Sequence, residues 1–311
     1  MRPLFGYHLP DFTFPDVPPE ALFEHVAGIA QQAEAAGFDL VTVMDHFYQI
    51  RGVGPEEAPM LEAYSTLAGI AARTSRVRLG ALVTGVTYRN PALLAKTVTT
   101  LDVISGGRAI LGLGAAWNES EHRGYGFDFP GIGERMDRLD ETLTICHRMF
   151  TEDRPTFEGR FYRIEQALNQ PRPIQPGGPR IMVGGGGEQR TLRLVARHAD
   201  YAHWFPLGME TLLHKSELLE RYCEEIGRDP GTITKTMASP VLLVANERDR
   251  DARLAQIPPE RRGSVVVATP VNAAEIINAY VEAGFGGFTF GNTMLPNDEL
   301  GLAAELIASF A

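Results

Sequence analysis

The stretch Arg108–Gly126, RAILGLGAAWNESEHRGYG, carries the main evidence for the fold of this chain. It opens with an apolar run at 109–113, which has the length of a buried strand. Gly112 and Gly114 allow the backbone to turn sharply and to approach another molecule closely. Polar and aromatic residues follow: Trp117, Asn118, Glu119, Glu121, His122, Arg123 and Tyr125. Functional groups of α/β proteins gather past the carboxyl ends of strands, so this is a candidate site, with an ordinary solvated loop as the alternative.

The same order of a short apolar strand and then a helix recurs eight times along the 311 residues. The predicted strands are 4–7, 40–44, 77–83, 109–113, 180–183, 200–204, 236–245 and 287–290. The predicted helices are 20–36, 60–73, 91–105, 134–150, 188–198, 209–226, 273–283 and 298–310. Eight such units predict an α/β fold, a (β/α)8 TIM barrel. A doubly wound sheet is the alternative, but it is usually shorter or divided into two domains.

Two segments interrupt this repeat. Residues 154–179, after the fourth long helix, are rich in Pro, Gly and aromatic residues and contain a predicted hairpin at 156–162. Residues 247–262, after the seventh strand, are charged and predict an inserted surface helix and loop. No linker-like shift in composition divides the chain, so we expect residues 1–311 to form a single domain.

The composition excludes several classes of partner. The 39 acidic and 29 basic residues give a net charge of −10, which disfavours nucleic acid. No apolar run approaches the ~20 residues of a membrane span, and the N-terminus lacks a signal-peptide core. Cys146 and Cys223 lack the spacing of a disulfide or metal site and are expected to be reduced. We therefore expect a cytoplasmic protein that acts on a small-molecule substrate, with no nucleic-acid or membrane partner.

A run of four glycines follows the fifth predicted strand and precedes a predicted helix. These residues are Gly184, Gly185, Gly186 and Gly187. Their free backbone N–H groups and the positive end of a helix dipole suit a phosphate group. A tight turn that needs positive φ is the alternative, but four glycines exceed that need. The run matches neither a Walker loop nor a dinucleotide fingerprint.

Candidate catalytic residues lie at the ends of the predicted strands, which share one face of a barrel. His46 follows an aspartate at the end of the second strand and is suited to hydrogen-bond a ring system or to transfer a proton. A histidine satisfied by the local backbone is the alternative. His8 and Glu121 are weaker candidates. Glu121 and His122 lack the spacing of metal ligands, so we expect no metal site.

Four blocks of the sequence resemble the bacterial luciferase-like superfamily, and within it the oxidoreductases that depend on the deazaflavin coenzyme F420. The longest block runs from Thr74 to Gly126 and contains the opening stretch. The others are AEAAGFDLVTVMDHF at 33–47, ERMDRLDETLTI at 134–145 and PRIMVGGGGEQRTLRLVARHAD at 179–200. The resemblance covers nearly the whole chain, and the block from Thr74 to Gly126 is its most specific part.

The resemblance implies a barrel with a deazaflavin, or alternatively flavin mononucleotide (FMN), at the carboxyl face, and a homodimer. It implies a non-prolyl cis peptide between Leu82 and Val83 that supports the tricyclic ring. It also places His46 near the reactive edge of the ring and Glu188 along the phosphate. The implied coenzyme contacts are His46, Leu82, Val83, Thr84, Asn118, Gly184, Gly185, Gly186, Gly187 and Glu188.

One position departs from the pattern of the superfamily. Its glucose-6-phosphate dehydrogenases carry a proton-handling glutamate, and bacterial luciferase a phosphate-binding arginine, where this chain has Ala115. Alanine favours a general F420-dependent reductase or dehydrogenase that transfers a hydride between the deazaflavin and a small organic substrate. An FMN-dependent luciferase-like monooxygenase and a non-catalytic coenzyme-binding barrel are the alternatives.

Overall fold

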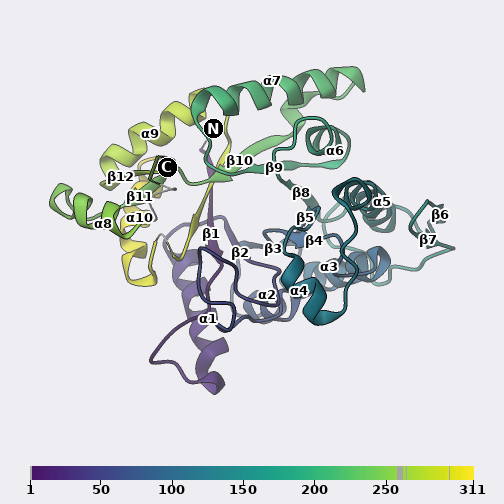
Figure 1. Cartoon of the computed structure of the whole chain (residues 1–311), viewed down its shortest axis with the longest axis horizontal. Helices are drawn as coiled ribbons and strands as arrows, with labels where there is room; N and C mark the ends of the chain where they lie inside the picture. Colours follow the sequence, from purple (N-terminus) through teal and green to yellow (C-terminus); the bar gives the residue numbers. More distant parts are fainter. Residues whose placement is uncertain (1, 258–261, 264, 294) are drawn as a thin grey trace.

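Eight parallel strands close into a barrel in the computed structural model, which describes residues 2–257, 262–263, 265–293 and 295–311 (Figure 1). The strands follow the order β3-β2-β1-β13-β10-β9-β8-β5, and β5 pairs back with β3. Their bounds are β1 (Leu4–Leu9), β2 (Leu40–Val43), β3 (Arg78–Ala81), β5 (Ala109–Gly114), β8 (Arg180–Gly184), β9 (Tyr201–Trp204), β10 (Thr234–Ala238) and β13 (Gly287–Gly291). The predicted (β/α)8 barrel is confirmed.

Helices surround the barrel because each parallel connection must cross back outside the sheet (Figure 1). They are α1 (Pro19–Ala35), α2 (Ala63–Ala71), α3 (Pro91–Ser105), α5 (Ile132–Thr151), α6 (Thr191–His198), α7 (Met209–Glu225), α9 (Pro270–Glu282) and α10 (Leu300–Ala308). Local sequence sets these limits. The Asn90 side chain accepts from Ala92 N at the start of α3, and Gly106, with φ of 69°, ends that helix.

The third predicted strand, 77–83, is interrupted in the structure. β3 ends at Ala81, the Leu82–Val83 peptide is cis as expected, and β4 (Thr84–Gly85) resumes the pairing with β5. This bulge explains two glycines of the opening stretch. A Cβ at Gly112 would lie 2.0 Å from the Ala81 carbonyl oxygen, and one at Gly114 would lie 2.9 Å from a Val83 methyl. Both positions therefore need glycine because the bulge occupies the space of a side chain.

The seventh predicted strand, 236–245, is wrong as a single element. β10 ends at Ala238, and β11 (Val241–Leu243) pairs with β12 (Val266–Ala268) in a separate two-stranded sheet. Pro240 lies between β10 and β11 and cannot donate to a sheet, which explains the break. The insertion continues into α8 (Arg250–Gln256), so its predicted surface helix is confirmed, whereas 258–261 lie outside the described residues.

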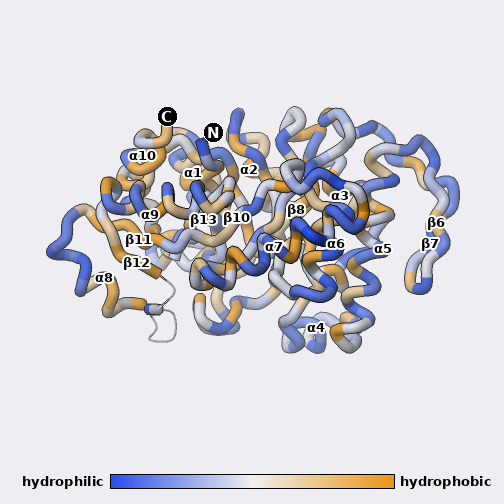
Figure 2. The backbone as a smooth tube through the Cα atoms, turned by 90° about the horizontal axis from the view of Figure 1, so that it is seen from above, coloured by the Kyte–Doolittle hydropathy of each residue, from blue (hydrophilic) through white to orange (hydrophobic). Residues whose placement is uncertain are grey.

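The predicted hairpin is confirmed, but its second strand lies further along the chain. β6 (Phe157–Glu158) pairs antiparallel with β7 (Arg163–Ile164), and Gly159–Tyr162 form the turn. Glu141 on α5 accepts hydrogen bonds from the turn amides and holds them in place. Figures 1 and 2 show this hairpin and α8 at opposite ends of the longest axis.

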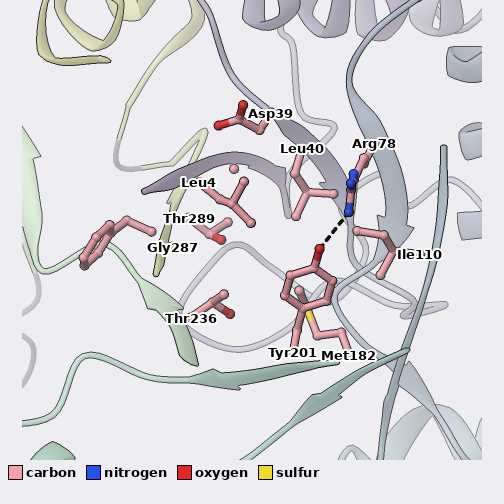
Figure 3. Close-up of a pocket in the computed structure, with 12 residues that line it drawn as sticks. Leu4, Asp39, Leu40, Arg78, Ile110, Met182, Tyr201, Thr236, Gly287 and Thr289 are labelled. Atoms are coloured by element: carbon pink, nitrogen blue, oxygen red, sulfur yellow. Dashed lines mark hydrogen bonds between the residues drawn. The ribbon is translucent and has the colours of Figure 1, made fainter. Parts of the chain in front are cut away.

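A small cavity lies inside the amino-terminal end of the barrel (Figure 3). First residues of strands, among them Leu4, Leu40, Arg78 and Tyr201, line it, and Arg78 donates to the Tyr201 hydroxyl at 2.7 Å. Its volume of about 30 Å³ admits a water molecule but no coenzyme. The candidate residues His8, His46 and 184–187 lie instead at the opposite, carboxyl end of the strands. No helix among the described residues has both the length and the apolarity to cross a membrane.

Candidate active site

Three histidines meet at the carboxyl end of the barrel. His8 lies near the end of β1, His46 follows β2, and His203 lies near the end of β9. The three imidazoles are close enough that His203 and His46 each lower the pKa of His8. The predicted face of the barrel therefore brings together the two histidines chosen from the sequence and a third, His203.

His46 is paired with a buried carboxylate. The Nδ1 atom of His46 lies 2.7 Å from Oε1 of Glu121, and Glu121 is fully buried. Phe47 N donates to the other carboxylate oxygen at 2.8 Å, and the Tyr88 hydroxyl donates to Oε1. Burial alone would raise the pKa of Glu121, but hydrogen bonds from His46, Tyr88 and Phe47 hold it below its usual value. The ionised carboxylate accepts a hydrogen bond from Nδ1–H of His46, so the other ring nitrogen, Nε2, takes no part in this pair.

The sequence does not reveal the partners of Glu121. Residues 119–125 form a short helix, α4 (Glu119–Tyr125), which is not among the helices predicted from the sequence. This helix turns Glu121 inward, where it has no access to a substrate. Tyr88 lies in the loop after β4 and has no recognisable motif around it. Burial and the hydrogen bond to Glu121 raise the pKa of the Tyr88 phenol, so Tyr88 remains a neutral donor.

A second ion pair lies behind His46. Asp45 is buried, and both of its carboxylate oxygens accept from Arg89, at 2.5 and 3.0 Å. Burial raises the pKa of Asp45 despite the opposing charge of Arg89. Thr84, an expected coenzyme contact, is fully buried, and its hydroxyl lies 2.7 Å from that of Tyr64. The Thr84 side chain thus belongs to this buried network and does not face the mouth of the barrel.

His8 and His203 have threonine partners in place of a carboxylate. His8 Nδ1 lies 2.9 Å from Thr42 Oγ1, and His203 Nδ1 lies 3.0 Å from Thr236 Oγ1. Burial, followed by the neighbouring His203, lowers the pKa of His8 to about 3. Burial lowers the pKa of His203 to about 4. Both rings are therefore neutral at physiological pH, and His46 is the histidine of this group with a carboxylate to stabilise a proton.

Replacing His8 with glutamine is expected to make the free energy of unfolding depend less on pH in the acid range. The pKa of His8 is about 3 in the folded protein and 6.5 ordinarily, so the unfolded chain binds more protons between these values. The free energy of unfolding therefore falls as pH falls through this window. Glutamine does not titrate, so the variant should take up as many as about one proton fewer on unfolding, and its free energy of unfolding should change less with pH. Urea unfolding between about pH 4 and 7 measures it. Exposed His147→Gln on α5 is the control, and an equal flattening in both variants would contradict the assignment.

The glycine run forms an open loop at the end of β8. Gly185 has φ of 111°, and its N–H donates to His203 O. Within the described residues, the N–H groups of Gly186 and Gly187 donate to no acceptor. The predicted helix start at Glu188 is wrong, because α6 begins at Thr191. The side chain of Arg190 donates to Gly133 O and Asp137 on α5, which holds residues 188–190 in a turn.

A lysine that the sequence analysis missed lies beside this loop. Lys215 on α7 donates to Gly186 O at 2.7 Å and to Glu188 Oε1 at 3.0 Å. The hydrogen bond from Lys215 lowers the pKa of exposed Glu188. Lys215 occupies the buried stripe of its helix together with Leu212 and Leu219. A lysine on an apolar stripe was thus the signal available in the sequence.

Asn118 and Trp117 lie at the rim. Asn118 precedes α4, its carbonyl accepts from His122 Nδ1 at 2.5 Å, and its side-chain oxygen accepts from Ser120. The Asn118 amide nitrogen has no acceptor within the described residues. Trp117 packs its ring edge to face with His46 at 5.4 Å and is 58% exposed. The rim therefore offers an amide donor and an aromatic wall.

These groups fit a phosphorylated tricyclic coenzyme. The free amides of Gly186 and Gly187, next to the Lys215 ammonium, suit a phosphate. The Val83 side chain fills the space beside Gly184, where a Cβ would lie 2.9 Å from its methyl group, so the barrel wall is apolar here. Asn118 adds a free donor. No set of three His, Cys, Asp or Glu side chains in the described ranges is arranged to hold a metal ion.

The family follows from comparison with known proteins. The model of the luciferase-like monooxygenase family matches residues 4–279. The chain belongs to this family.

Among curated relatives, the F420-dependent glucose-6-phosphate dehydrogenase of Kineococcus radiotolerans is 34% identical over 301 residues, covering 85% of this chain and 86% of that protein. The pyrimidine monooxygenase RutA of Agrobacterium fabrum is 30% identical over 240 residues, covering 74% and 62%. An F420-dependent secondary alcohol dehydrogenase, solved with an F420-acetone adduct, superposes with a TM-score of 0.83 at 19% identity over 100% of both chains. That likeness shows the shared fold.

Proposed function

We propose that this chain is an oxidoreductase that uses coenzyme F420 to transfer a hydride to or from a small organic substrate. The observation that carries this proposal is the His46–Glu121 pair, which places a proton-transfer group at the carboxyl end of the barrel. The curated relatives named as F420-dependent dehydrogenases support the choice of coenzyme. Ala115 supports a substrate other than a sugar phosphate, because it replaces the proton-handling glutamate expected of those dehydrogenases.

The residues at the mouth divide the binding of the coenzyme between them. The phosphate is held by the N–H groups of Gly186 and Gly187 and by the Lys215 ammonium. Gly184 and Gly185 have no side chains and so leave space for the coenzyme beside the barrel wall. Leu82 and Val83 support the tricyclic ring, and Asn118 donates to it from the rim. Glu188 neutralises Lys215, and Thr84 contributes through its backbone. When bound, F420 supplies a carbon at position 5 that accepts or donates a hydride.

His46 handles the proton that accompanies hydride transfer. Its Nδ1–H is committed to Glu121, so Nε2 takes the proton from a substrate hydroxyl in oxidation and returns it in reduction. The Glu121 carboxylate stabilises the resulting imidazolium, as a buried carboxylate does in a hydrolase triad. His8 has no carboxylate partner and remains neutral, so its role is to shape the chamber. Trp117 and the barrel wall exclude water from the reacting groups.

Replacing Lys215 with methionine is expected to weaken coenzyme binding by about 10- to 100-fold, because a charged hydrogen-bond donor is removed beside the phosphate loop. Fluorescence titration of the purified protein with F420 measures the dissociation constant. Lys235→Met is the matched control, since Lys235 lies near the amino-terminal end of β10 and pairs with Glu220. Unchanged affinity in Lys215→Met would contradict this role for Lys215.

Parallel titrations of the purified protein with F420 and with FMN test the proposed function. We expect tight binding of F420 and hydride transfer with a reducible or oxidisable substrate. Tight binding of FMN alone, with oxygen consumption by the reduced flavin, would instead place the chain with the monooxygenases of the family. Binding of F420 without turnover on any substrate would support a non-catalytic barrel.

We also propose that the protein is a cytoplasmic homodimer. The resemblance to the superfamily supports dimerisation, and exposed apolar residues on α3, such as Leu93 and Ile104, offer a surface for it. Light scattering of the purified protein measures the mass, and a monomer at micromolar concentration would contradict the proposal.

A further inference from the structure

We infer that His203 is a ligand-binding residue whose Nε2 accepts a hydrogen bond from an O–H or N–H group of a ligand at the carboxyl end of the barrel. The inference deepens the proposed function and rests on it for the ligand. It concerns a residue that the proton-transfer step does not use. Three observations carry it: the hydrogen bonds of Thr236, the partners of Nε2 and the neutral surroundings of the ring.

The hydrogen bonds of Thr236 fix the tautomer of His203. Thr236 lies opposite His203 in the register of β10 and β9. Its hydroxyl donates to Ala202 O at 2.8 Å, which uses the single hydrogen of that group. The contact of 3.0 Å between Thr236 Oγ1 and His203 Nδ1 must therefore have Nδ1–H as the donor. A neutral imidazole with Nδ1–H carries a lone pair on Nε2.

The lone pair on Nε2 has no donor within the described residues. The His203 ring remains partly exposed, and its backbone neighbour across the sheet is Gly184, which adds no side chain. Thr236 also lines the small cavity at the amino-terminal end of the barrel (Figure 3). The Nε2 atom of His203 is therefore the ring nitrogen left to accept a hydrogen bond from a ligand.

The surroundings select a neutral donor. His8 is the adjacent imidazole, and its pKa and that of His203 are both lowered, so neither ring carries a charge that would attract an anion. A carboxylate or phosphate oxygen would face the Nε2 lone pair without a hydrogen between them. A hydroxyl or a ring N–H can donate a hydrogen bond to this lone pair. The shared chemistry is therefore a neutral donor, supplied either by an alcohol substrate or by the ring of the coenzyme.

Nuclear magnetic resonance tests the tautomer in the protein without any ligand. Long-range proton–nitrogen-15 correlations distinguish the two neutral tautomers, and His203→Phe assigns the signal. We expect the Nδ1–H form in the wild type and in Thr236→Ser, which keeps the hydroxyl, and a mixture of forms in Thr236→Val. Thr289→Val, at another threonine of the barrel interior, is the matched control and should change nothing. An Nε2–H form in the wild type would overturn the inference.

Ligand additions then identify the donor. The probes are F420 alone and F420 with 2-propanol or with glucose 6-phosphate. A shift of the Nε2 resonance with F420 alone assigns the donor to the coenzyme, and a shift that requires the alcohol assigns it to the substrate. In either case, His203→Phe should raise the dissociation constant of that ligand about 3- to 10-fold. An unmoved Nε2 resonance with all three probes overturns the inference.

The two proposals fail in different ways. If F420 does not bind to the wild-type protein, the proposed function is wrong, while the tautomer of His203 is still measured in the free chain. If F420 binds and turns over a substrate while the Nε2 resonance does not move, the inference about His203 is wrong and the proposed function stands.

Discussion

Replacing His46 with alanine is expected to lower turnover by about 10²- to 10⁴-fold, the usual contribution of a positioned acid or base. The affinity for F420 should change by no more than a few-fold, because the proposed phosphate site at Gly186 and Gly187 lies on a different strand end. Steady-state turnover and a fluorescence titration of the same preparation separate these two effects. The loss should appear in kcat, since the proton is transferred in the chemical step.

Two further variants make this test specific to the His46–Glu121 pair. His147→Ala, on the exposed face of α5, should have no effect and serves as the control. Glu121→Gln keeps the shape of the side chain but removes the charge that stabilises a protonated His46, so it should lower kcat while leaving coenzyme affinity unchanged. Wild-type turnover in His46→Ala would remove His46 from proton transfer.

Replacing Asp45 with alanine is expected to lower the free energy of unfolding by about 3–5 kcal/mol, because it leaves a buried guanidinium without its main partner. The Arg89 side chain is 13% exposed, and Asp45 is 1% exposed and holds it through two hydrogen bonds. Urea unfolding followed by circular dichroism measures the change. The same pair lies directly behind His46, so the variant should also lose turnover.

An exposed ion pair provides the comparison for Asp45. Glu119 pairs with Arg123 on α4, and both side chains are more than half exposed, so Glu119→Ala should cost no more than about 1 kcal/mol. The double variant Asp45→Leu with Arg89→Met should recover part of the stability, because it removes both buried charges together. Arg89 also donates to Glu62 Oε1 at 2.5 Å. A loss for Asp45→Ala as small as that for Glu119→Ala would show that this second carboxylate fully compensates Arg89.

The barrel could be predicted from the sequence because its strands and helices alternate with clear apolar patterns and glycine or proline ends. The errors have local causes. The strand predicted for 236–245 looked continuous because the strongly apolar Val241–Leu243 follows Met237 and Ala238 closely, although Pro240 breaks the pairing between them. The helix before Thr191 began later than expected because Arg190 is held by α5, a contact that lies far away in sequence.

The site could be predicted as a list of residues but not as a set of partners. His46 and Glu121 were both candidates, yet 75 positions separate them in the sequence. Only the fold shows that the Glu121 carboxylate contacts the His46 ring. Tyr88 gave no signal at all, since a tyrosine in a loop is common. Lys215 did interrupt an apolar stripe. The roles of the expected coenzyme contacts remain predictions for the binding experiments.

The break at Pro240 gives the last insertion a small core of its own beside the barrel. β11, β12 and α8 enclose a small core of their own, formed by Leu242, Val244, Leu254, Ile257, Val265 and Val267. The chain leaves the barrel after Ala238 and rejoins it at α9, and Val241, Leu243 and Ala268 still pack in the main core. The residues of the insertion that face its own small core are therefore the ones least tied to the packing of the barrel strands. Substitutions in that small core should therefore disturb the insertion locally while the strand ends at the carboxyl face of the barrel keep their arrangement.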